Sequence, residues 1–145
     1  MASRVVTYSK EFSINSDPVH DMMLGSQSNI VGNNGSLRTA AAGDLVIITA
    51  DDSVQIVRLI ERLTICTLWK DAGGPCVWDH NFTYIPLTGI FHKRDVQGNL
   101  QVLYEKHSIK RNPANFFNSR LHAHELLPVV LELVESKKVL DRSDI

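Results

Sequence analysis

The stretch LVIITADDSV, residues 45–54, decides the fold. It begins with an aliphatic and β-branched run, passes through a polar step at Asp51 and Asp52, and continues as a second apolar run to residue 65. Two β-rich runs joined by a short polar turn predict a β-hairpin. Aspartate side chains favour turns, so we interpret the two carboxylates as turn residues rather than as a catalytic pair.

The returning half of this hairpin does not alternate perfectly between apolar and polar positions. The apolar residues Ile56, Leu59 or Ile60, and Leu63 should lie on one face of the strand. Arg58 and Glu61 should lie on the opposite face, but strict alternation does not place them so. One extra residue in the strand restores the alternation, so we expect a β-bulge near residues 59–60.

The flanking sequence adds further elements. Apolar spacing and capping residues predict a first strand over residues 4–14, a short helix over 37–42, strands over 82–91 and 100–104 divided by a turn at 95–99, and helices over 114–121 and 128–138. This order lacks the regular strand–helix alternation of a doubly wound parallel sheet. The prediction is an α+β fold: a small curved antiparallel sheet or open β-barrel, flanked by helices.

Length and composition are those of one ordinary globular domain, which we place at residues 1–145. The chain of 145 residues is 43% apolar and 21% charged, and no apolar stretch approaches the length that crosses a bilayer. Residues 1–12 mix charges with apolar residues and do not resemble a secretory signal. We therefore expect a cytoplasmic or nuclear protein with no membrane partner, in which Cys66 and Cys76 are free thiols.

Charge is sorted along the chain although the total is nearly neutral. Residues 92–120 carry a formal surplus of four positive charges, whereas residues 121–145 carry a deficit of two. Cations that could contact a nucleic-acid backbone are Lys93, Arg94, Lys106, Lys110, Arg111 and Arg120. Flat side chains that could stack on bases occur nearby, at Tyr104, Phe116 and Phe117. The alternative is that the cations are solvated and the phenylalanines belong to the core.

No catalytic motif is present. The sequence has no nucleophile elbow, phosphate-binding loop or His-Glu-x-x-His pattern. His122 and His124 are two residues apart, whereas a helical chelate requires a separation of three or four. We therefore predict no catalytic residue, no metal and no cofactor, and retain a histidine-dependent hydrolase or nuclease only as a third hypothesis.

Trp69 and Trp78 bracket a Gly-Gly-Pro turn and are followed by the polar residue Asp79. Two indoles beside a turn are suited to form the walls of a base-sized pocket. The alternative is that one or both pack in the core.

The segment from residue 32 to 63 resembles the PUA-like superfamily, which includes the EVE, ASCH and YTH domains. The similarity comprises Asn34, Leu37, Ala41 and the Gly43-Asp44 step into an aliphatic strand, and it covers about a quarter of the chain. It implies a β-barrel with external helices and a pocket for a modified or flipped base. Base-edge contacts would come from Ser28, Asn29 and Asn34, and stacking from Trp69 or Trp78. Ile30 and Val31 depart from the family, which has an aromatic residue there.

Two functions follow from these observations. The first is a nucleic-acid-binding module that recognises a modified or flipped base in DNA or RNA. The second is a protein-interaction module, such as an inhibitor, immunity or accessory protein, that uses the acidic final helix or exposed aromatic residues.

Overall fold

The computed structural model describes residues 5–9, 30–33, 37–63, 80–117 and 124–137. In chain order the elements are β1 (Val5–Ser9), β2 (Ile30–Asn33), β3 (Leu45–Ala50), β4 (Ser53–Leu63), β5 (His80–Pro86), β6 (Phe91–His92), α3 (Arg94–Lys106), the 3-10 turns η1 (Pro113–Asn115) and η2 (His124–Leu126), and α4 (Leu127–Lys137). The α+β class predicted from the sequence is confirmed.

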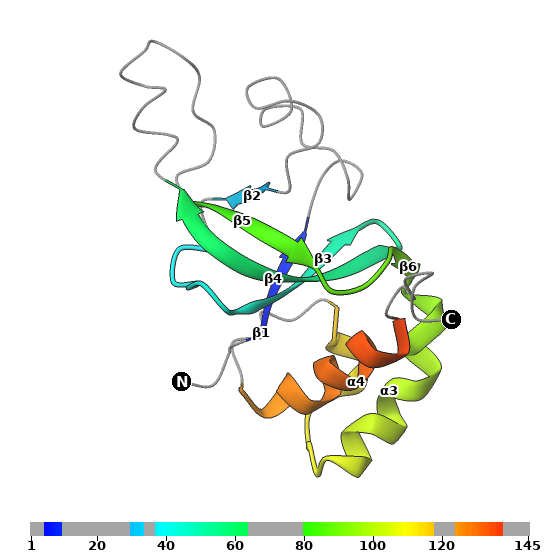
Figure 1. The fold of residues 1–145 in the computed structure, drawn as a ribbon. Coiled ribbons are helices and arrows are strands. Elements are labelled where there is room, and N and C mark those ends of the chain that lie inside the picture. Colours follow the sequence, from blue (N-terminus) through cyan, green and yellow to red (C-terminus); the bar gives the residue numbers. More distant parts are fainter. Residues whose placement is uncertain (1–4, 10–29, 34–36, 64–79, 118–123, 138–145) are drawn as a thin grey trace, which may run out of the picture.

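The strands form one open sheet in the order β1-β3-β4-β5-β2, with the short β6 paired to β4 (Figure 1). The central pairs β3–β4, β4–β5 and β5–β2 are antiparallel, as predicted, whereas β1 adds to β3 in parallel. Among the described strands, β1 and β2 end the sheet and do not pair with each other. The sheet is therefore not closed into a barrel.

The hairpin and its bulge are both confirmed. β3 and β4 pair down to Ala50 opposite Ser53, which leaves Asp51 and Asp52 as the turn, with Asp51 at a left-handed φ of 52°. Asp is one of the few residues that tolerate this conformation. Pairing of β4 with β5 shifts register between Leu59 and Glu61, the position predicted for the bulge.

Strand β3 lies at the centre of the molecule, and all six of its residues are buried. Alternate side chains enter two different cores because successive residues of a strand point to opposite faces. Leu45 and Ile47 face α3 and α4, which cover one side of the sheet, whereas Val46 and Ile48 join Leu37, Phe82 and other residues on the opposite side (Figure 1). This explains why residues 45–48 are apolar at every position.

The strand predicted over residues 100–104 is wrong, because this segment belongs to helix α3. Val96, Leu100 and Tyr104 are buried at intervals of four, which is helical periodicity. Gly98, which suggested a turn between two strands, is an exposed residue inside the helix. The other predicted strand, over residues 82–91, is divided into β5 and β6.

Residues 37–42 form turns rather than the predicted helix. The Asp44 carboxylate accepts a hydrogen bond from the Ala41 amide at 2.9 Å, and the Asp44 amide donates to the Ala41 carbonyl at 3.1 Å. Gly43 has a φ of +93°, which L side chains adopt only with strain. A local carboxylate–backbone bond thus replaces the helical pattern.

The remaining predictions are confirmed in part. β1 occupies the described part of the predicted first strand, and α4 reproduces the predicted last helix. Asn112 caps the turn that follows it, since its Oδ1 accepts from the Ala114 amide at 3.0 Å. In the described residues this turn extends only through η1. Ile30 and Val31, where the resembled family has an aromatic residue, form part of β2.

Beyond Pro86 the chain stays attached to β4 through Thr88. The amides of Leu87 and Thr88 both donate to the Ile56 carbonyl, at 2.8 and 3.3 Å. The buried Thr88 hydroxyl accepts from the Ile56 amide at 3.2 Å and donates to the Gly89 carbonyl at 2.7 Å. A side chain therefore satisfies a strand amide where the neighbouring strand has ended.

Candidate functional site

The residues predicted to bind a base are Ser28, Asn29, Asn34, Trp69, Trp78 and Asp79, and all six lie outside the described residues. The positions where their segments join the sheet are described. Asn33 pairs with His80, and Leu63 pairs with Asn81 on the other side of β5. The ends of β2 and β4 and the start of β5 therefore lie together at one end of the sheet, hereafter the loop end (Figure 1).

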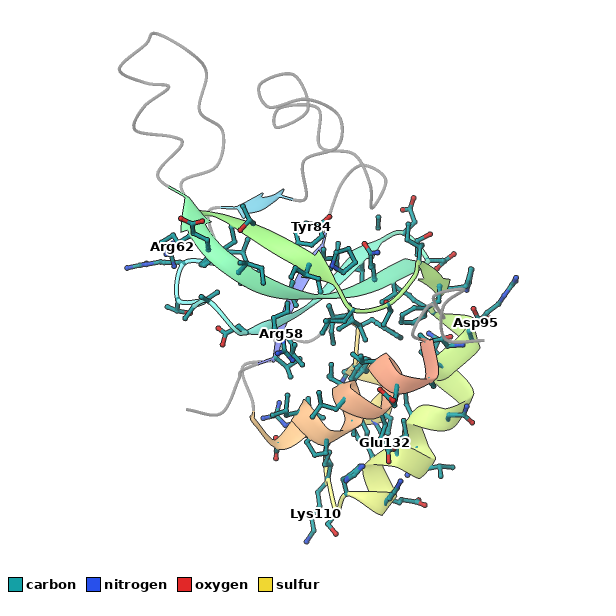
Figure 2. The ribbon with its side chains drawn as sticks, viewed as in Figure 1. Arg58, Arg62, Tyr84, Asp95, Lys110 and Glu132 are labelled. Carbon is teal, nitrogen blue, oxygen red and sulfur yellow. The ribbon has the colours of Figure 1, made fainter. Side chains whose placement is uncertain are left out.

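Arg62 lies at the loop end and holds residues 37–40 against the sheet (Figure 2). Its Nη2 is a donor to the carbonyls of Ala40, Arg38 and Leu37, at 2.9, 3.2 and 3.4 Å. Its guanidinium carbon lies 4.5 Å from the centroid of the Phe82 ring, which is the cross-strand partner of Arg62. The segment that follows the predicted pocket residue Asn34 is thus fixed to β4 by one cation.

Sequence reasoning did not identify Arg62 as a functional candidate. Its partners are three carbonyls more than 20 residues earlier and a ring on the next strand. The register shift at the bulge places Arg62 opposite Phe82. The sequence signal for this role is the pairing of a cation with an aromatic residue on the neighbouring strand. This pairing can be predicted only when the position of the bulge is known.

The Gly43-Asp44 step, which suggested the family resemblance, has a structural role. The Gly43 amide donates to the Leu59 carbonyl at 2.7 Å, and the Leu59 amide donates to the Asp44 carbonyl at 3.0 Å. These bonds continue the β3–β4 ladder up to the bulge. Asp44 is buried and holds the 41–44 turn, so the pair fixes this turn to β4 beside the bulge.

The predicted backbone-binding cations do not form one patch. Lys93 and Arg94 lie at the start of α3, whereas Lys106, Lys110 and Arg111 lie at its end or just beyond. A helix of 13 residues separates the two groups by about 20 Å, at about 1.5 Å per residue. The sixth predicted cation, Arg120, lies outside the described residues.

Two cations of the second group pair with carboxylates near or within the last helix. Lys106 bonds to Glu132 of α4, and Arg111 bonds to Glu125 of η2. The pKa of Glu132 is lowered, chiefly by the hydrogen bond from Lys106. The nearby charges of Lys106 and His107 act in the same direction, whereas desolvation opposes them. Basic and acidic segments that are separate in sequence thus neutralise each other in space. Within the described part of the chain Lys110 forms no such pair.

The aromatic residues of the basic segment belong to the core, as the alternative interpretation proposed. Tyr104, Phe116 and Phe117 are each at most 9% exposed. Their rings pack edge to face, with centroids 6.4 Å apart for Tyr104 and Phe116 and 4.9 Å apart for the two phenylalanines. Burial also raises the pKa of Tyr104. These rings support α3 and are not presented for base stacking.

A groove of about 650 Å³ lies between α3 and α4. Its apolar lining includes Val96, Val102, Leu103 and Leu133, and its rim carries Asp95 from α3 and Glu135 from α4. We call it the α3–α4 groove. The groove combines exposed apolar side chains with carboxylates on both walls, and no sequence pattern indicated it.

The described residues contain no group of three or more His, Cys, Asp or Glu side chains placed to hold a metal ion. In the same part of the chain no helix combines the length and apolar character needed to cross a membrane. No protein-family model matches the sequence, and comparison with characterised proteins gives no significant match.

Proposed function

We propose that the chain is a non-catalytic nucleic-acid-binding module related to the PUA-like superfamily, with an open sheet in place of the barrel that the resemblance implies, and that it reads a modified or flipped base with the segments attached at the loop end. The observation that carries the proposal is the pairing of Asn33 with His80 and of Leu63 with Asn81. Two chain segments, residues 34–36 and 64–79, therefore join the sheet at neighbouring positions, and they contain Asn34, Trp69, Trp78 and Asp79, whereas Ser28 and Asn29 precede Ile30 at the other end of β2.

This arrangement suits base recognition for a physical reason. Reading an extruded base requires planar groups to stack on it and hydrogen-bonding groups at its edge. Asn34 directly follows Asn33, and Asp79 directly precedes His80, so the chain itself restricts how far these two residues lie from a paired strand position. Functional loops on a rigid scaffold are the common location of binding residues.

The distribution of cations predicts how such binding depends on salt. Lys106 and Arg111 already contact carboxylates, whereas Arg94 and Lys110 are exposed. Each phosphate contact contributes close to one unit to the slope of log affinity against log salt concentration. We expect a shallow slope, of about two to three contacts, and an affinity set mainly by the base.

The test is a fluorescence-anisotropy titration of short single- and double-stranded oligonucleotides, with and without modified bases, at two salt concentrations. Trp69→Ala and Trp78→Ala should weaken binding of the preferred base, and Lys110→Ala should weaken all sequences equally. Lys137→Ala is the matched control, because this cation lies on α4 outside the basic segment. The proposal is overturned if the wild-type protein binds none of these oligonucleotides at low salt.

A further inference from the structure

The α3–α4 groove combines exposed and buried apolar side chains in one concave surface. Val102 is 62% exposed, while Val96 and Leu133 form a buried floor, at 2% and 3%. An exposed valine on a helix is ordinary by itself, but here it stands at the edge of a concave surface with an apolar floor.

The rim of the groove is acidic on both walls. Asp95 lies in the first turn of α3, where its Oδ2 accepts from the backbone amide of His92, and Glu135 is exposed on α4. Neither carboxylate forms an ion pair within the described part of the chain. The cation on the rim, Lys137, lies over the Phe91 ring at 5.8 Å.

We propose that the α3–α4 groove docks a basic amphipathic helix of a partner protein. Apolar side chains of that helix would contact Val102 and Leu103, and flanking Lys or Arg side chains would meet Asp95 and Glu135. Lining residues on α3 run from Asp95 to Leu103, about 12 Å of helix, which matches two turns of a bound helix with anchors three or four residues apart. An acidic or uncharged helix would lack the pairing at the rim.

Two synthetic peptides test the proposal on the full chain. One is a helix of about 18 residues with leucines along one face and lysines elsewhere, long enough to be helical in water, and the other replaces every lysine by glutamate. Anisotropy titrations at about 0.15 M salt, where long-range attraction is screened, should show the Leu/Lys peptide binding at least about tenfold more tightly.

Substitutions locate the binding. Val102→Asp places a charge in the apolar contact and should weaken the Leu/Lys peptide by about tenfold or more. Leu131→Asp is the matched control: Leu131 is a 44% exposed apolar residue of α4 that does not line the groove, and its change should alter affinity less than about twofold. Both positions are exposed, so both variants should fold, and circular dichroism checks that they do.

Charge is tested in the same way. Glu135→Lys should reduce the preference for the Leu/Lys peptide, whereas Glu105→Lys changes an exposed carboxylate of α3 outside the groove and should not. The proposal is overturned if the wild-type protein binds neither peptide, if it binds both equally, or if Val102→Asp and Leu131→Asp have equal effects. None of these measurements depends on nucleic-acid binding.

Discussion

Replacing Arg62 by alanine should release residues 37–40 from the sheet and destabilise the protein by about 1.5 kcal/mol. The Nη2 atom carries two hydrogens, so it satisfies at most two of its three carbonyl partners at once. Hydrogen bonds from charged donors contribute about 1.5–3 kcal/mol in buried sites and less where water competes, as it does here. The contact with the Phe82 ring adds about 0.5–1 kcal/mol.

Urea unfolding followed by circular dichroism measures this change, and a loss of 1.5 kcal/mol corresponds to a decrease in Tm of about 3–6 °C for a domain of this size. Arg62→Lys should recover less than half of the loss, because an ammonium lacks the planar fork. Arg58→Ala is the matched control. Arg58 is an exposed arginine of the same strand with no bond to residues 37–40, so its loss should cost less than about 0.5 kcal/mol. Equal effects of the two alanine variants would refute the role assigned to Arg62.

Three further predictions concern the scaffold. Thr88→Val leaves the buried Ile56 amide without its acceptor and should cost about 1–3 kcal/mol in urea unfolding, more than Thr88→Ser, which keeps the hydroxyl; the reverse order would contradict this assignment. Gly98→Ala should stabilise by about 0.5–1 kcal/mol, since an added Cβ at Gly98 meets nothing within 4 Å, and destabilisation would argue for a turn instead of a helix. Glu132 has a lowered pKa, chiefly through its bond from Lys106, so its contribution to stability is present above the unfolded-state value of about 4.5 and is lost as pH falls through the folded-state pKa. Stability curves of the wild type and Glu132→Gln should therefore differ at neutral pH and converge in acid, and parallel curves would exclude the bond as the cause.

The sequence predicts the centre of the fold well because local and tertiary signals agree there. In β3 and β4, the β-branched residues, the Asp-Asp turn and the break in alternation all predict the same structure, a hairpin with a bulge. The bulge lies between Leu59 and Glu61, as predicted. At α3 the same kind of reasoning is wrong. Val96, Leu100 and Tyr104 fit a helix, but Gly98 and the apolar residues at 100, 102, 103 and 104 also fit a turn followed by a strand. Packing against α4 and η1 decides between these two patterns, and packing is not visible in a short window.

The candidate sites show a second limit, which concerns charge. Counting cations over residues 92–120 predicts a basic surface, yet the count contains no information on partners. Lys106 and Arg111 are paired with Glu132 and Glu125, residues that the same count assigned to a separate acidic segment. The expected single basic surface does not form, because the length of α3 separates the cations into two groups and because η2 and α4 bring carboxylates to the second group.

The two proposed sites have different locations in the fold, and this can be tested. The loop end is formed by the ends of β2 and β4 and the start of β5, whereas the α3–α4 groove lies between the helices that cover one face of the sheet (Figure 1). Arg62 lies at the end of β4 and Val102 lies on α3, at two separate surfaces, so their effects should add. Arg62→Ala should weaken oligonucleotide binding and leave Leu/Lys peptide affinity unchanged, and Val102→Asp should do the opposite. If both variants weaken both ligands in proportion to their loss of stability, the two surfaces are not separate sites, and partial unfolding explains the change in binding.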